Sequence, residues 1–441
     1  MLVVDLLVTS YRVAITYKNN LGGNMQVSRS FIFLLLCIQF LTCGFVKANI
    51  PSNELQIAIF GLGGRAQDVL AECIQLQKET GKTIHVVAVC DNSAKESYDF
   101  YVKNRIPNEL FNDYAKAFES VKVYSDNEEG IISLLQNHPN VNRIFITSPN
   151  NRHAVHLQAV LDHSACQNIY LEKPLFKTIE EFSQFNRDLG NRNIQVGLTL
   201  RSAKITSLAA QHLKLFKSDL GKLKKVHSYE HVNFGHGLSI IMMNWRRYIS
   251  LSGGLLIEKS VHDLDLASFF MEAVDVHPKT IDISTKTQHN FYKKSNKQLI
   301  IDRLLADANV RKSAEVWDLI PWQRAINFSY DSHKKIDWQK TMDNFFEEFP
   351  EDADLDKSDI IPDTQVVRTR IKTTLGDEIY FELDLKLNGF ETQTERGTNL
   401  FFENGQVIID MESSKMHVQV KNKVPIEIDL KLFFTLRYKY R

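Results

Sequence analysis

The chain has few cysteines, and their spacing suits neither a disulfide framework nor a cysteine-based zinc site. None of the five cysteines in the 441 residues belongs to a C-x-x-C pair, the spacing typical of zinc and redox sites. Cys37 and Cys43 lie in an apolar N-terminal stretch, whereas Cys73, Cys90 and Cys166 lie in or beside predicted helices and strands. We expect the last three to be small buried thiols, and we expect no metal site.

The chain also has no excess of charge of either sign. Lys plus Arg and Asp plus Glu both number 53, so the composition lacks the positive charge that a nucleic-acid-binding surface requires. The hydrophobic content of 44% is enough for a sizeable core and argues against wholesale disorder. The length suggests about two or three domains.

Residues 1–48 are predicted to be a signal- or anchor-like segment outside the fold. Arg29 precedes a nearly uninterrupted apolar run, Phe31 to Val46, and Val46 and Ala48 stand at the positions that a signal peptidase inspects. Met25 could be the true start. The run is short for a bilayer span, so a cleaved signal peptide and a membrane tether both stay open. If residues 25–48 do neither, we expect a cytoplasmic protein.

The most informative stretch is Gln56-Ile-Ala-Ile-Phe-Gly-Leu-Gly-Gly-Arg-Ala66. An apolar β-type run enters a glycine turn, and apolar residues at helical spacing follow. In a dinucleotide-binding turn, the first glycine allows a tight bend, the second lets backbone approach the diphosphate, and a later small residue permits close packing. The N–H groups and dipole of the helix then favour phosphate. The candidate cofactor-binding residues here are Gly61, Gly63, Gly64, Arg65 and Ala66. The alternative is a glycine-rich turn that binds nothing.

An acid stands where the dinucleotide pattern requires one. Residues 84–90 are predicted to form the next strand, and Asp91 follows directly. A carboxylate at this position can accept hydrogen bonds from both ribose hydroxyls and would repel a 2′-phosphate. The sequence therefore favours NAD over NADP.

Two polar loops follow later strands of the same pattern. In a doubly wound sheet the carboxyl ends of the strands form the ligand crevice. Ser148-Pro149-Asn150 and His153 follow a predicted strand at residues 141–147, and Glu172-Lys173-Pro174 follows another at 168–171. Ser148, Pro149, Asn150, His153 and Glu172 are therefore candidate cofactor-binding residues. The alternative for the first loop is an ordinary helix start with a capping Asn.

Lys173 is a candidate catalytic residue. Because a proline follows it, its backbone is restricted to an extended conformation. A partly buried lysine there would have a lowered pKa and could share a proton with a substrate hydroxyl. The alternative is an ordinary surface lysine.

A third polar segment opens a helix predicted at residues 255–270. Glu258 and His262 are four residues apart, so they would share one helical face. The carboxylate could then orient the imidazole, which could act as a base near neutral pH. A surface pair or a buried structural histidine is the alternative.

The order of the predicted elements indicates the fold class. Short strands alternate with helices over residues 55–200, which predicts a doubly wound parallel sheet. Longer strands with alternating polar and apolar residues follow, and they predict an α+β unit around an open, largely antiparallel sheet. We therefore divide the chain into a Rossmann domain at 49–200 and a substrate-binding and oligomerisation domain at 201–441.

Taken together, the glycine turn, the Ser-Pro-Asn-x-x-His loop, Glu-Lys-Pro and the Gly-Gly…Glu-x-x-x-His segment resemble the Gfo/Idh/MocA family. The resemblance runs from about Leu55 to Met411. It implies a Rossmann domain, an open-sheet domain that often forms oligomers, and reversible NAD(P)-dependent oxidation of a sugar or polyol hydroxyl. Lys173 matches the lysine that assists proton movement, and His262 matches the catalytic histidine. Glu258 stands where the family pattern usually has Asp.

The resemblance also suggests a substrate loop and a leading function. Trp245 and Arg246 match a loop in which Trp could stack on a sugar and Arg could bind hydroxyls or a carboxylate. The leading hypothesis is an NAD-dependent dehydrogenase of a sugar or cyclitol, which binds no nucleic acid and is expected to be a homo-oligomer. The alternatives are an NAD-assisted glycosidase with tightly held cofactor and a non-catalytic sugar- or nucleotide-binding protein on the same fold.

Overall fold

The computed structural model describes residues 54–104, 106–185, 189, 191–242, 245–306, 329–333, 335–348, 355, 358–389 and 394–431. The predicted signal- or anchor-like segment, residues 1–48, lies outside the described residues, and so do Cys37 and Cys43. Within the described residues, no helix has the length and apolar character needed to cross a membrane.

The first half forms a sheet in which every neighbouring pair of strands is parallel. Its strands are β1 (Glu54–Phe60), β2 (Thr83–Cys90), β3 (Lys122–Tyr124), β4 (Arg143–Ile146), β5 (Asn168–Leu171) and β6 (Asn193–Val196). Their order in space is β3-β2-β1-β4-β5-β6. The order reverses between β1 and β4, and this is where doubly wound sheets bind their ligands.

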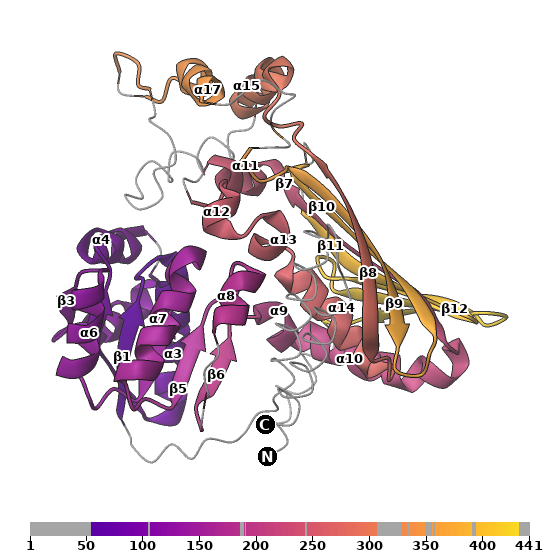
Figure 1. Ribbon diagram of the computed structural model, residues 1–441, viewed down its shortest axis with the longest axis horizontal. Helices are drawn as coiled ribbons and strands as arrows, with labels where there is room; N and C mark the ends of the chain where they lie inside the picture. Colours follow the sequence, from indigo (N-terminus) through magenta and orange to yellow (C-terminus); the bar gives the residue numbers. More distant parts are fainter. Residues whose placement is uncertain are drawn as a thin grey trace.

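Helices cover both faces of this sheet (Figure 1). They are α3 (Gly64–Thr80), α4 (Ala94–Asn104), η2 (Asn108–Leu110), α5 (Phe111–Ala117), α6 (Glu128–Asn137), α7 (Asn150–His163) and α8 (Ile179–Gln184). Successive residues of a strand point to opposite faces. Ile57 and Ile59 of β1 accordingly join an apolar cluster with α3, α4 and α5, whereas Ala58 and Phe60 join another with α6 and α7.

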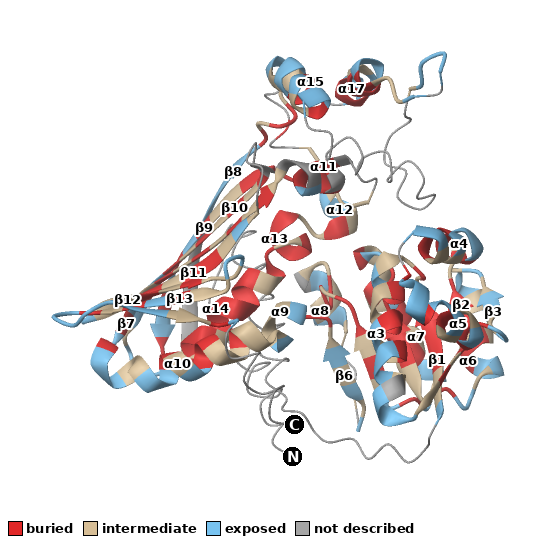
Figure 2. Cartoon of the chain, turned by 180° about the vertical axis from the view of Figure 1, so that it is seen from behind, coloured by how far each residue is buried: buried red, intermediate tan, exposed pale blue. Residues whose placement is uncertain are grey.

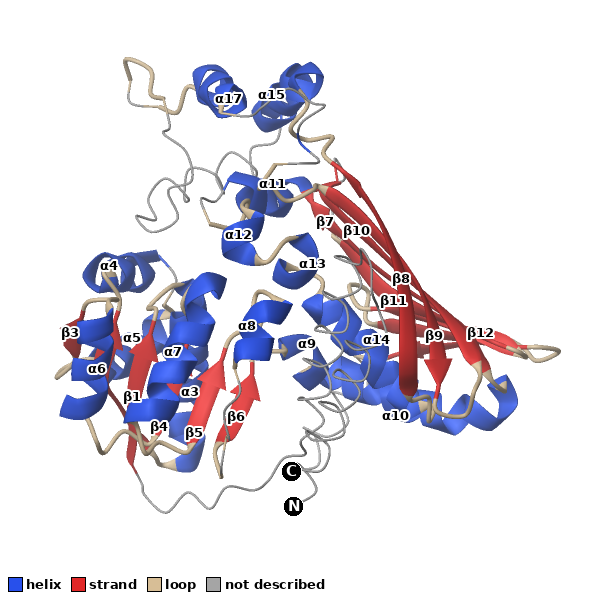
Figure 3. Cartoon of the chain, viewed as in Figure 1, coloured by secondary structure: helices blue, strands red, loops and turns tan. Residues whose placement is uncertain are grey.

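The second half is built on an open eight-stranded sheet (Figure 3). Its strands are β7 (Leu223–Asn233), β8 (Pro278–Gln288), β9 (Thr364–Thr373), β10 (Glu378–Gly389), β11 (Glu395–Phe402), β12 (Gly405–Asp410), β13 (Lys415–Val420) and β14 (Ile426–Asp429). The order is β14-β13-β12-β11-β7-β10-β9-β8, in which β7 and β10 are parallel and the other neighbours antiparallel. The predicted fold class is therefore confirmed.

The remaining helices lie between the two sheets, against the large sheet, or beyond its end (Figure 1). They are α9 (Thr199–Ser202), α10 (Lys204–Leu220), α11 (Phe234–Met242), α12 (Ile249–Ser252), α13 (Leu255–Glu258), α14 (Val261–Ala273), η3 (Lys294–Asn296), α15 (Lys297–Ala306) and α17 (Trp338–Glu347). α14 packs against α9, α10 and β7, and α12 packs against α7 of the first half. Figure 2 shows that α13 and α14 are largely buried.

One predicted boundary and one predicted element can be compared with the structure. β6 ends at Val196 and α9 begins at Thr199, so the predicted domain boundary between 200 and 201 falls inside a helix and stays a prediction. The single helix predicted at 255–270 is two helices, because α13 ends at Glu258 and α14 begins at Val261. Lys259, at the break, directs its ammonium to the buried Glu230 of β7, 3.0 Å away. Glu258 and His262 therefore do not share one helical face.

Candidate active site

The glycine turn after β1 requires a glycine at its first position. Gly61 has φ +85°, which side chains rarely tolerate. A Cβ there would lie 2.5 Å from Cα of Ser148, in the loop after β4. The N–H of Gly61 donates to the Cys90 carbonyl at the end of β2 (2.9 Å). The turn is thus held close to two neighbouring strand ends.

The start of α3 fits the diphosphate of a dinucleotide. Gly63 is the N-cap of this 17-residue helix, and no side chain caps it. The first turn contains no acidic residue and does contain Arg65. An uncapped helix start with a basic residue, beside the point where the strand order reverses, favours an anion. The turn at positions 61–66 therefore fits the diphosphate of NAD.

Asp91 supports this turn from the end of β2. Its two carboxylate oxygens accept hydrogen bonds from the backbone N–H groups of Leu62 and Ser93, both at 2.7 Å. Burial raises the pKa of Asp91, and these two N–H groups oppose the shift. The carboxylate retains further acceptor positions. Its predicted contact with the ribose hydroxyls therefore stays a prediction.

Glu172 is bound to the first turn of α3. Its Oε1 lies 2.7 Å from Nε of Arg65, and the Tyr170 hydroxyl donates to the same oxygen. Arg65 also donates to the Tyr170 hydroxyl at 3.3 Å. Glu172, predicted to bind cofactor, here fixes the arginine at the helix start.

His153 is buried between the loops that follow the carboxyl ends of β4 and β5. Its ring is fully buried, with Nδ1 2.6 Å from the Pro174 carbonyl and Nε2 2.8 Å from the Ser148 carbonyl. Burial lowers its pKa. The prediction that His153 offers a polar group to the cofactor does not fit this placement. The ring instead joins the loop after β4 to the loop after β5, and so positions Lys173.

Asn150 connects the two halves of the chain. It is the first residue of α7, which Pro149 precedes as N-cap. Its side-chain amide donates to the Ser252 carbonyl and to Glu258 Oε2, both at 2.8 Å. The amide is buried and faces α12 and α13. It therefore ties the loop after β4 to the helices of the second half.

Lys173 projects from the end of β5 toward α13. Its ammonium donates to the Glu258 carbonyl and lies 3.5 Å from Glu258 Oε2. Burial lowers the pKa of Lys173, as expected from the sequence, although Glu258 opposes the shift. The ammonium is therefore poised to give up a proton more readily than a surface lysine does.

Glu258 holds Lys173 rather than His262. Its carboxylate is 1% exposed and contacts Lys173, Asn150 and Arg246, whose Nε lies 3.1 Å from Oε1. Among the described residues, Nδ1 of His262 has no hydrogen-bond partner. The prediction that Glu258 orients the imidazole is therefore wrong. The helix break at 259–260 is the physical reason, since it separates the two side chains.

His262 is a neutral imidazole at neutral pH. Burial lowers its pKa well below the ordinary value, and the nearby charges of Lys173 and Arg396 lower it further. The side chain is only partly buried. A neutral imidazole that keeps some exposure is the form that accepts a proton.

The predicted substrate loop lies beside the same carboxylate. The guanidinium of Arg246 is 5.0 Å from the centroid of the Trp245 ring and forms the ion pair with Glu258. Both side chains are partly buried. Arg246 is thus placed within the site, and its predicted contact with substrate stays a prediction.

Sequence reasoning missed a buried ionic group beneath His262. Arg396 of β11 forms ion pairs with Glu230 of β7 and with Asp263 of α14, the latter at 2.9 Å. Lys259 also pairs with Glu230. Burial, with Glu230 adding to it, raises the pKa of Asp263 to about 7, although Arg396 opposes the shift. The signal in the sequence is one acid, Glu230, at an inward position of β7, which does not identify its partners.

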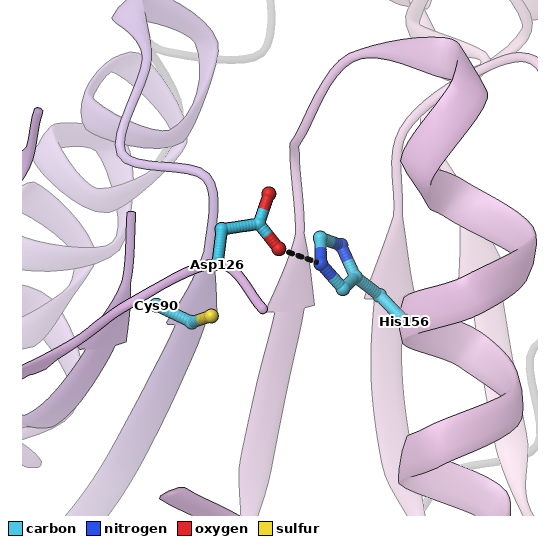
Figure 4. Close-up of side chains that lie close together, drawn as sticks. All are labelled: Cys90, Asp126 and His156. Atoms are coloured by element: carbon cyan, nitrogen blue, oxygen red, sulfur yellow. Dashed lines mark hydrogen bonds and ion pairs between the residues drawn. The ribbon is translucent and has the colours of Figure 1, made fainter. Parts of the chain in front are cut away.

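Sequence reasoning also missed a cluster below the glycine turn (Figure 4). Possible ligand atoms of Cys90, Asp126 and His156 lie within 4.8 Å of one another. These are residue types that bind zinc. However, Arg152 already pairs with the Asp126 carboxylate at 2.7 Å, and burial raises the pKa of Cys90 to about 12, which disfavours a metal-binding thiolate.

The cluster instead forms a hydrogen-bonded chain that ends at the loop after β4. His156 Nε2 lies 2.8 Å from Asp126, and Nδ1 lies 2.9 Å from the Ser148 hydroxyl. Ser148 is also the residue that packs against Gly61. These hydrogen bonds therefore hold Ser148 in place against the glycine turn.

Two consecutive family models match the sequence. The oxidoreductase family model for an NAD-binding Rossmann fold, GFO_IDH_MocA, matches residues 55–197, and its C-terminal alpha/beta domain matches residues 214–305. Together they cover more than half of the chain. The uncharacterized oxidoreductase YrbE of Bacillus subtilis (strain 168) is 27% identical over 150 residues, which are 32% of this chain and 39% of that protein. The chain thus matches less than half the length of this curated relative.

Solved structures share the fold at low sequence identity. Levoglucosan dehydrogenase in complex with NADH has a TM-score of 0.51 and 14% identity, over 85% of this chain and 80% of that one. An inositol dehydrogenase homolog complexed with NAD⁺ from Azotobacter vinelandii has a TM-score of 0.53 and 13% identity, over 85% and 76%. With the two family matches, this likeness shows that the chain belongs to the Gfo/Idh/MocA oxidoreductase family and contains its NAD-binding Rossmann domain.

Proposed function

We propose that the protein is an NAD-dependent dehydrogenase that moves a hydride between a hydroxyl-bearing carbon of a sugar or cyclitol and nicotinamide. The observation that carries the proposal is the contact of Lys173, at the end of β5, with Glu258, together with the neutral His262, whose pKa the charge of Lys173 lowers. Lys173 follows a strand at the carboxyl edge of the parallel sheet, where the fold binds its ligands. The sugar and inositol dehydrogenases that share the fold support the substrate class.

The residues of positions 61–66, with Asp91, would hold the cofactor, and NAD supplies the hydride acceptor when it is bound. His262 accepts the proton of the substrate hydroxyl, because its imidazole is neutral and its side chain is only partly buried. Glu258 does not balance the charge of the imidazolium that forms, because its carboxylate pairs with Lys173 and Arg246.

Lys173 orients the substrate hydroxyl. One of its N–H groups donates to the Glu258 carbonyl, and an ammonium has three donors. The remaining donors are free to approach a substrate oxygen, while the Glu258 carboxylate balances the charge. Asn150 keeps that carboxylate in place across the two halves of the chain.

The test begins with a search for substrate. The full chain is incubated with NAD and a panel of sugars and cyclitols, and NADH formation is followed by absorbance. His262→Ala is then expected to lower kcat/KM on the best substrate by about 10²–10⁴-fold, because the general base is lost, while NAD affinity stays unchanged. His163→Ala, an exposed histidine at the end of α7, is the matched control.

The pH profile gives a second readout for the same prediction. Because the pKa of His262 is well below 6.5, the base stays neutral through that pH, and activity is lost only as pH falls through the lowered pKa. Full turnover by His262→Ala would contradict the proposal. Bond cleavage without net NADH release would favour the glycosidase alternative instead.

A further inference from the structure

The charged groups around Glu258 and His262 are arranged in two layers. The cationic side chains retain some exposure, at 17% for Lys173, 28% for Arg246, 14% for Lys259 and 13% for Arg396. The acids that pair with them are almost fully buried, at 1% for Glu258 and 2% for Glu230 and Asp263. The cationic side chains, and not the carboxylates, are therefore the part of these ion pairs that keeps contact with solvent.

The buried acids do not fully balance these cations. Lys173 and Arg246 share the charge of Glu258, and Lys259 and Arg396 share that of Glu230. The third acid, Asp263, holds its proton part of the time at neutral pH, because burial raises its pKa to about 7. His262 is neutral and adds no charge. With Lys173 protonated, four cations thus face between two and three negative charges, and a positive excess remains.

Arg246 is the cation best placed to receive a further anion. Its Nε lies 3.1 Å from Glu258 Oε1, and the guanidinium carbon lies 5.0 Å from the centroid of the Trp245 ring. Within the described residues, its two terminal nitrogens form no ion pair, and its side chain is the most exposed of the four cations. A planar guanidinium with a free edge fits a carboxylate or a phosphate.

The diphosphate of the cofactor does not account for this excess. Its predicted position is the start of α3, where Arg65 is the basic residue and is paired with Glu172. Three of the cations, Lys173, Arg396 and Lys259, instead lie close enough to the proposed proton acceptor His262 to lower its pKa, and the fourth, Arg246, pairs with Glu258.

We propose that the substrate is an anionic sugar or polyol, a sugar acid or a sugar phosphate, whose negative group pairs with Arg246. This inference rests on the proposed function, because it assigns the substrate of the same site. Carboxylate and phosphate share the chemistry that the guanidinium recognises, and the experiment separates them.

The test compares matched anionic and neutral sugars. The full chain, saturated with NADH, is titrated by calorimetry with glucuronate, galacturonate and glucose 6-phosphate, and with glucose and galactose as their neutral partners. We expect at least one anion to bind about tenfold or more tightly than its neutral partner, as a charge-assisted hydrogen bond allows. The preferred probe identifies carboxylate or phosphate as the recognised group.

Arg246→Gln is expected to remove most of this preference while NADH affinity stays unchanged. The matched control is Arg368→Gln, since Arg368 is an exposed arginine on β9. The proposal is overturned if neutral sugars bind as tightly as the anions in every pair, if no sugar binds, or if Arg246→Gln keeps the full preference. An anion preference without any hydride transfer would refute the proposed function alone, and hydride transfer that favours neutral sugars would refute this inference alone.

Discussion

The glycine turn after β1 and the helices α13 and α14 both contribute to the candidate active site, yet they hold their polar groups in different ways. The turn relies on backbone geometry, with a left-handed Gly61 and N–H groups that donate to Cys90 and Asp91. The two helices rely on buried charges contributed by distant segments, such as Arg396 with Glu230 and Asp263. The geometry of the cofactor-binding turn therefore depends mainly on the backbone of the turn itself and its adjoining strand ends. The arrangement of α13 and α14 depends on the assembly of the whole second half.

This difference predicts that substitutions in the two regions lower the free energy of unfolding by different amounts. Loss of one partner from a buried ionic group leaves an uncompensated charge, which costs about 3–5 kcal/mol. A strained backbone position costs about 1–3 kcal/mol. The substrate side should therefore be the more fragile region in stability, although the cofactor side carries the more specific sequence pattern.

Arg396→Met gives the largest expected effect on stability. It leaves Glu230 and Asp263 buried without their shared partner, so we expect a loss of about 3–5 kcal/mol in the free energy of unfolding. Urea denaturation measures this change. Arg368→Met, on the exposed side of β9, is the control and should change stability by about 0.5 kcal/mol or less. A loss below about 1 kcal/mol for Arg396→Met would show that the ionic group does not stabilise α14.

Gly61→Ala gives a smaller expected loss of stability, with a marked effect on the cofactor. The new Cβ would meet Cα of Ser148 at 2.5 Å at a φ of +85°, so we expect a cost of about 1–3 kcal/mol and weaker NAD binding. Gly376→Ala is a close control, because Gly376 also has φ +85° but a Cβ there would meet no atom within 4 Å among the described residues. The difference between the two variants isolates the contact with Ser148. Equal losses, with NAD affinity unchanged, would contradict the role given to this turn.

The same comparison explains what could be predicted from the sequence. The glycine turn, Asp91 and the loops that carry Asn150 and Lys173 follow strand ends, and parallel strands bring their carboxyl ends to one edge, so their convergence could be predicted. The separation of Glu258 from His262 could not, because the local pattern does not mark the break between α13 and α14, where Lys259 pairs with the distant Glu230. Arg396 is 133 residues from Asp263, and no local pattern connects them. The buried position of His153 could not be predicted either, because its two carbonyl partners come from separate loops.

A calorimetric titration of the full chain with NAD and with NADP tests most directly whether the turn at 61–66 and Asp91 hold an NAD diphosphate and ribose beside Lys173 and His262. We expect saturable NAD binding at one site per chain, and weaker NADP binding because Asp91 disfavours a 2′-phosphate. If neither cofactor bound to the folded protein, the turn would not be the cofactor site.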